Sequence, residues 1–169
     1  AADEFNPSSA IDGTEVPDAD VNGPGFGAGA EGAIGIGSGF SDTYGVALEA
    51  RVGYSLGSGL YVGGAASYFM GQTVNTESAH ATFLGGEVGY KYFATSRLEI
   101  RPYVFVGPAF VTQVSVAPFF VASKTDLAIQ PGATVTLHLG RAFIGADARW
   151  LVTPAPNTLA ILASGGVGF

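Results

Sequence analysis

The 169-residue chain has no cysteine and few charged residues. Without cysteine it can form no disulfide and offers no thiolate for catalysis or metal binding. Only 12% of its residues are charged, about half the share of an average globular domain, whereas 47% are hydrophobic. A surface this poor in charge is unlike that of an ordinary soluble protein.

Apolar segments typical of membrane helices are also missing. The two longest charge-free runs cover residues 52–76 and 102–123, and each is long enough to cross a bilayer. The first contains six glycines and the second three prolines, so both are poor helices and good strands. In lipid, the only other structure that satisfies every backbone polar group is a closed β-barrel.

Negative charge is concentrated in residues 1–24, which hold six of the fourteen acidic residues and no basic one. Their Pro, Gly, Ser and Asp content predicts a disordered or loosely docked periplasmic tail. Asp18, Asp20 and Asn22 match the first half of a Ca²⁺ loop, but Gly29 stands where the bidentate acid is expected. A turn-forming linker and a weak calcium site are the alternatives. Nucleic-acid binding is excluded because Lys and Arg do not cluster anywhere in the chain.

Eight apolar alternating segments follow the tail, separated by turn residues. They cover roughly residues 25–36, 44–56, 60–72, 80–93, 99–113, 123–139, 142–152 and 159–169. Tight connections at 57–59, 94–98 and 140–141 alternate with longer ones at 38–43, 73–79, 114–122 and 153–158. We therefore predict an all-β, eight-stranded antiparallel up-and-down transmembrane barrel over 25–169, with both termini periplasmic.

Charged residues of these segments fall on one parity of the two-residue alternation. We assign to the lumen Glu31, Glu49, Arg51, Glu87, Lys91, Glu99, Arg101, Asp147 and Arg149. An ionised group facing hydrocarbon costs about 2–4 kcal/mol at the midplane, and an eight-stranded barrel leaves room only for side chains. A packed, salt-bridged core is expected, with a proton or ion path as the alternative. Glu31 and Glu49 are expected to lie opposite each other, bridged by Arg51 and Arg149.

Outward-facing aromatic residues lie near the predicted strand ends. Tyr54, Tyr68, Tyr90, Tyr92 and Trp150 form the expected aromatic belt of the membrane interfaces, although ordinary β-propensity of aromatics is an alternative explanation. The third long connection carries Phe119 and Phe120. An exposed apolar loop indicates a contact surface, unless it folds over the barrel mouth.

Residues 159–169 alternate and end on Phe169, and this stretch resembles the last strand of bacterial outer-membrane barrels. In that family the terminal Phe belongs to the signal read by the insertion machinery. The stretch RPYVFVGPAF, residues 101–110, and the pairs Gly53-Tyr54 and Gly89-Tyr90 resemble strands of the eight-stranded OmpA/OmpX type. This resemblance implies an outer-membrane location, with outer-membrane lipid and the insertion machinery as partners. The sequence shows no signal peptide, so we expect a mature chain from which it has been removed.

No catalytic set is apparent. Some barrels of this membrane modify lipid A, which requires a nucleophile, a base and an orienting acid. Ser78 and His80 share a face of the chain but Glu77 does not, and His138 points inward without a neighbouring serine. We predict a monomeric, non-enzymatic barrel without cofactor or metal, acting as a structural or surface-contact (adhesion-like) protein with a partner at the outer loops. The alternatives are a narrow conduit for small hydrophobic molecules or ions and, less favoured, a lipid-modifying enzyme.

Overall fold

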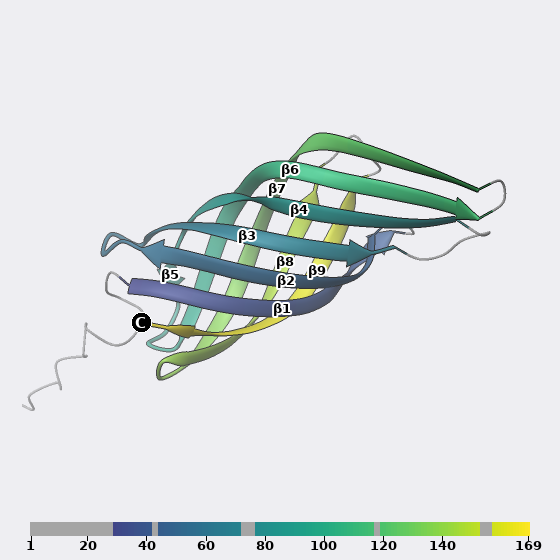
Figure 1. Cartoon of the computed structure of the whole chain (residues 1–169). Coiled ribbons are helices and arrows are strands. Elements are labelled where there is room, and N and C mark those ends of the chain that lie inside the picture. The colour runs from purple at the N-terminus through teal and green to yellow at the C-terminus, as the bar shows by residue number, and fades with distance from the viewer. Residues whose placement is uncertain (1–28, 42–43, 72–76, 117–118, 153–156) are drawn as a thin grey trace, which may run out of the picture.

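The computed structural model describes residues 29–41, 44–71, 77–116, 119–152 and 157–169, which form β-strands joined by tight turns (Figure 1). Glycine alternates with β-branched and aromatic residues along them, a composition that disfavours helix and suits a pleated sheet. Within these residues there is no helix of the length and hydrophobicity that a membrane span requires. The strands are β1 (Gly29–Ser41), β2 (Tyr44–Ser55), β3 (Leu60–Met70), β4 (Glu77–Tyr90), β5 (Tyr92–Phe93), β6 (Leu98–Val116), β7 (Phe119–Leu139), β8 (Ala142–Leu151) and β9 (Thr158–Gly168).

All pairings are antiparallel and the sheet closes on itself. Strands follow one another in the order β4-β3-β2-β1-β9-β8-β7-β6-β5, and β4 also pairs with β6. β5 is a short continuation of β4 past Lys91, whose backbone N–H donates to the Gly59 carbonyl at 2.8 Å. β4 and β5 therefore act as one strand of the barrel. The predicted eight-stranded up-and-down barrel is confirmed.

Tight turns gather at one end of the barrel. Gly59 (φ 87°) lies between β2 and β3, and Gly140 (φ 73°) between β7 and β8. These left-handed conformations favour glycine. β1 begins and β9 finishes at the same end, where the Phe169 N–H donates to the Ala30 carbonyl at 2.8 Å. We call this the turn end, and the opposite end, reached by Met70 and Leu151, the loop end.

Two of the longer connections predicted from the sequence are wrong. Residues 38–41 continue β1, and most of 114–122 belongs to a long β6–β7 hairpin in which Val114 lies opposite Val121. Pro118 and the Gly- and Ser-rich stretch near Ser38 had indicated turns. The alternation in fact runs on, because two paired strands satisfy each other's backbone groups beyond the barrel wall. Figure 1 shows this hairpin reaching past the neighbouring strands at the loop end.

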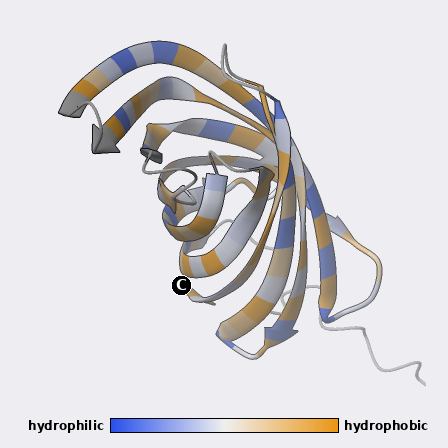
Figure 2. Ribbon diagram, turned by 90° about the vertical axis from the view of Figure 1, so that its right-hand side faces the viewer, coloured by the Kyte–Doolittle hydropathy of each residue, from blue (hydrophilic) through white to orange (hydrophobic). Residues whose placement is uncertain are grey.

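Successive side chains point to opposite faces of the wall. In β2, Val46, Leu48 and Val52 are exposed on the outside, whereas Glu49 and Arg51 are buried inside. Figure 2 shows the same alternation of hydrophobic and hydrophilic residues along the strands. The core is therefore the lumen, and its side chains determine what the barrel can do.

Candidate functional site

The lumen contains all nine charged residues that the sequence assigned to it. Eight of them are buried, and the side chain of Glu31 keeps 10% of its exposure. Each comes from the inward parity of its strand, so the residues converge from β1, β2, β4, β6 and β8 together with Lys91 between β4 and β5. They divide into two layers along the barrel axis.

The first layer is built around two arginines. Arg51 Nη2 lies 3.1 Å from Glu49 Oε1 and 3.2 Å from Asp147 Oδ2, while its Nε lies 3.2 Å from Glu87 Oε1. Arg149 Nη2 lies 2.7 Å from Asp147 Oδ1, and its guanidinium also pairs with Glu49. Each guanidinium is shared by carboxylates from different strands, as a buried charge requires.

Two tyrosines and a threonine complete this layer. The Tyr103 hydroxyl donates to Asp147 Oδ2 at 2.7 Å and the Thr134 hydroxyl donates to the same oxygen at 2.9 Å. The Tyr61 hydroxyl donates to Glu87 Oε1 at 2.7 Å. Arg51 also lies over the Tyr103 ring, 4.8 Å from its centroid. Each carboxylate of this layer thus faces at least one arginine.

The second layer lies nearer the turn end. Glu31 pairs with both Lys91 and Arg101. Glu99 Oε2 lies 3.5 Å from Lys91 Nζ and 3.0 Å from His138 Nε2. Arg101 lies 3.9 Å from the Tyr61 ring centroid, so Tyr61 contacts both layers.

The expected pairing of Glu31 with Glu49 is wrong. Glu31 lies opposite Gly53 and Glu49 lies opposite Gly35, so the two acids are displaced along the first hairpin and belong to different layers. Arg51 and Arg149 bridge Glu49 to Asp147 instead. The reason is the register, which places Glu31 close to the turn end.

Between the charge layers and the loop end the lumen is mainly apolar. The Tyr44 and Phe69 rings meet edge to face at 5.7 Å, Phe69 and Phe83 do so at 5.6 Å, and Leu151 and Leu162 are buried with them. Tyr44 and Phe83 were not predicted as lumen residues from the sequence, although Phe83 shares the inward parity of Glu87. This cluster packs in the lumen on the loop-end side of the charges.

Gln130 is a buried lumen residue whose amide is not paired within the described chain. Its side chain is fully buried, and neither its amide nitrogen nor its amide oxygen has a hydrogen-bond partner among the described residues. Inward parity alone identifies Gln130 as a lumen residue but cannot show whether it finds a partner.

The other predicted site residues lie on the outside or beyond the described chain. Tyr54, Tyr90 and Tyr92 are exposed near the turn end, and Tyr68 and Trp150 are exposed near the loop end. Phe169 is exposed as well. The described part of the chain includes the backbone of Phe119 and Phe120, at the start of β7, but not their side chains; Asp18, Asp20 and Asn22 lie outside it. The roles assigned to all these residues stay predictions.

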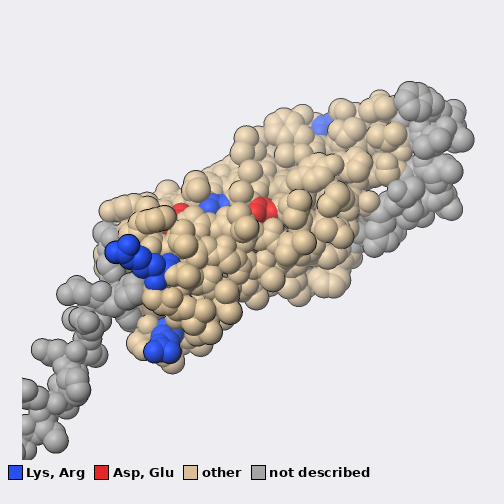
Figure 3. Space-filling view, turned by 60° about the horizontal axis from the view of Figure 1, so that its bottom comes forward, with Lys and Arg blue, Asp and Glu red and all other residues tan. Residues whose placement is uncertain are grey.

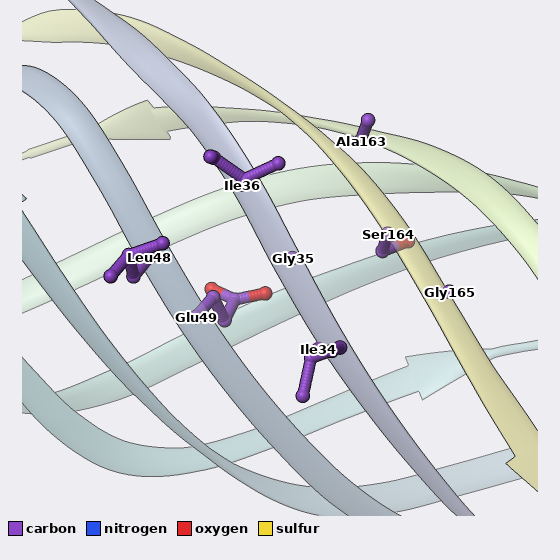
Figure 4. A pocket seen from close by; sticks show the side chains of 8 residues that line it. All are labelled: Ile34, Gly35, Ile36, Leu48, Glu49, Ala163, Ser164 and Gly165. Carbon is purple, nitrogen blue, oxygen red and sulfur yellow. The ribbon is translucent and has the colours of Figure 1, made fainter.

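The outer face is largely uncharged. Figure 3 shows Lys and Arg gathered near the turn end and only a few charged atoms over the middle of the visible face. A groove of about 620 Å³ lies where β2, β1 and β9 meet, with Glu49 beside Gly35 (Figure 4). It is lined by Ile34, Gly35, Ile36, Leu48, Glu49, Ala163, Ser164 and Gly165. Glu49 is the only charged residue of this lining, and its carboxylate is paired with Arg51 and Arg149. The surface of the groove is therefore mainly apolar.

The described contacts of the two histidines are with aromatic rings and with a carboxylate. The His80 ring stacks on the outward Tyr68 ring at 5.9 Å, and His138 contacts Glu99 within the lumen. The described residues contain no group of three or more His, Asp or Glu side chains arranged to hold a metal ion.

Comparison with solved structures shows the same fold. The N-terminal β-barrel domain of Pseudomonas aeruginosa OprF matches with a TM-score of 0.59 and 18% identity, covering 85% of this chain and 98% of that domain. Ail, the attachment invasion locus protein of Yersinia pestis, matches with a TM-score of 0.59 and 10% identity, covering 84% of this chain and 97% of Ail. A major outer membrane protein from Thermus thermophilus matches with a TM-score of 0.62 and 13% identity, covering 83% of this chain and 99% of that protein. No protein-family model and no curated protein matches the sequence.

Proposed function

We propose that the protein is an integral barrel of the bacterial outer membrane, without enzymatic activity, that holds the β6–β7 hairpin at the cell surface for contact. The observation that supports this most is the division of side chains by one closed sheet, with apolar residues exposed outside and charges buried inside. Such a face is stable in hydrocarbon and costly in water. Membrane lipid and the insertion machinery are then its partners, and Phe169 belongs to the insertion signal.

The packing of the lumen supports a contact role over a conduit. Tyr44, Phe69 and Phe83 pack near the loop end, and ion pairs occupy the part below. The hairpin is the part of the described chain that extends farthest from the barrel (Figure 1). The name of the structurally similar Ail describes a protein of attachment, which agrees with an adhesion-like role here.

Refolding from urea tests the membrane assignment. We expect the chain to acquire β circular dichroism and a heat-modifiable band on gels only when detergent or lipid is added. A folded, monodisperse protein in plain buffer would contradict the proposal.

A shortened hairpin tests the contact role. Val111 lies opposite Lys124, so an Asn-Gly turn joining these two residues can replace 112–123. We expect the shortened barrel to keep its heat-modifiable shift, because the described residues among those removed pair only with one another and with the start of β4. Bacteria displaying it should adhere to host-cell or abiotic surfaces less than bacteria displaying equal amounts of the full chain. Equal adhesion would contradict the contact role, and mass analysis of lipid A from the same cells tests for enzymatic activity.

A further inference from the structure

The outer half of β7 has one edge that is not paired. β6 is paired along its whole length with β7. On β7 this pairing covers residues Phe119 to Leu137, which lies near the turn end. On the other side, β8 pairs with β7 only from Gly132 to Leu139, followed by a single bridge between Ile129 and Val152. Over the described chain, no strand adds to this edge between Phe119 and Ala128.

The backbone groups on this edge can be identified from the bridge. Ile129 exchanges two hydrogen bonds with Val152, at 3.2 and 3.1 Å, so its N–H and C=O point away from β6. Alternate residues of a strand point the same way. Four residues therefore each present one backbone N–H donor and one C=O acceptor to the open side. They are Leu127, Thr125, Ser123 and Val121. At about 3.4 Å per residue, the open edge is roughly 30 Å long.

Some features that normally protect an edge strand are missing here. Proteins use proline, bulges and charged side chains, lysine especially, to prevent strand addition. Between Phe119 and Gln130 there is no proline, and the β6–β7 register contains no bulge. The one lysine, Lys124, pairs with Asp126 at 2.9 Å. Val121 and Leu127 leave the outward side of this edge apolar and exposed. The edge is suited to addition of an extended strand.

We propose that this edge binds the same edge of a second copy of the chain, antiparallel and centred on Thr125. In that register Thr125 exchanges hydrogen bonds with its own counterpart, and Ser123 does so with Leu127. Lys124 of each copy then lies opposite Asp126 of the other, a complementary pair that occurs twice. Centring one residue earlier would place Lys124 opposite itself, where like charges destabilise the pair.

This register also determines the arrangement of the two barrels. The twofold axis of an antiparallel pair reverses the strand direction, so the barrels point in opposite directions from the shared sheet. Each barrel stays a monomer in its own membrane, and the contact joins two facing membranes. The inference thus rests on the proposed surface-contact function and names its partner.

Nanodiscs carrying one full-length barrel provide the assay, because they leave both ends of the barrel accessible. Discs labelled with a donor dye and discs labelled with an acceptor dye should show energy transfer on mixing. Thr125→Pro should abolish it, because proline removes an N–H on the open edge without disturbing β6. Thr125→Val keeps that N–H and should behave like the wild type.

Charge exchange tests the partner. Lys124→Asp places two acids opposite each other and should weaken association about tenfold. Adding Asp126→Lys restores both pairs and should restore association. Since the protein has no cysteine, a short bis-maleimide can test the register: Thr125→Cys should link to itself, and Ser123→Cys should link to Leu127→Cys but not to itself.

Several outcomes would overturn the inference. If wild-type discs never associate, a second copy is excluded as the partner. The same conclusion follows if the double charge variant associates as weakly as the single variant. A third outcome is that the discs do not pair but the barrel binds another protein, and that Thr125→Pro abolishes this binding. The edge would then bind a strand of that other protein. A chain that fails to enter nanodiscs contradicts the membrane function itself, whereas normal insertion without pairing contradicts only this inference.

Discussion

Arg149 and Asp147 illustrate how a charged residue is tolerated in this lumen. Both side chains are almost completely buried, and each contacts more than one partner of opposite charge or a hydroxyl donor. Removing one member of such a pair leaves the other charge buried, unpaired and without water. The stability of the barrel thus depends on the whole network and not on one bridge.

Arg149→Leu should therefore destabilise the barrel by about 3–5 kcal/mol. The measurement is the urea midpoint in detergent, followed by fluorescence of Trp150, the only tryptophan. Lys124→Leu is the matched control, because Lys124 is exposed and should change stability by at most about 1 kcal/mol. Equal midpoints for the two variants would contradict the role assigned to Arg149.

Gln130 leads to the opposite expectation. A buried amide without a partner costs about 1–3 kcal/mol, and methionine has a similar volume. Gln130→Met should raise the urea midpoint, whereas Thr134→Val, which removes a hydroxyl that donates to Asp147, should lower it. A lower midpoint for Gln130→Met would show that the amide makes an interaction that matters.

At the scale of the strand and turn, positive φ angles explain where glycine is required. Gly140 has a φ of 73° and nothing within 4 Å of an added Cβ, so backbone strain is the only effect of a larger residue. Gly140→Ala should cost about 1–2 kcal/mol. Gly57→Ala in the first tight turn, also in open space but without positive φ, should be neutral. Thermal midpoints of the two heat-modifiable bands compare them directly.

The β6–β7 hairpin shows how far local pattern carries at this scale. The sequence predicted the two strands but not their length, because Pro118 and the apolar residues around it also suit a loop. The pairing of Val114 with Val121 shows that this segment is a strand hairpin and not a loop. This pairing is a contact between strands, and residue types alone do not specify it.

As a whole molecule, the barrel combines an apolar seal with an ion-paired core in a lumen as wide as its own side chains. We expect no current above leak from the wild-type protein in planar bilayers. An open porin added to the same membrane serves as the control. Discrete conductance steps from the purified barrel would favour the conduit alternative over the contact role.

The sequence by itself determined the number of strands and the face of each charged residue in the lumen. A two-residue alternation leaves charged side chains only one face that is free of hydrocarbon, and this holds before any contact is known. Only the tertiary structure decided which acid meets which base, because Glu31, Lys91 and Arg101 come from distant strands. Their meeting depends on the stagger at which the sheet closes. The aromatic seal and the open edge of β7 depend on the same closure, which is a property of the whole barrel.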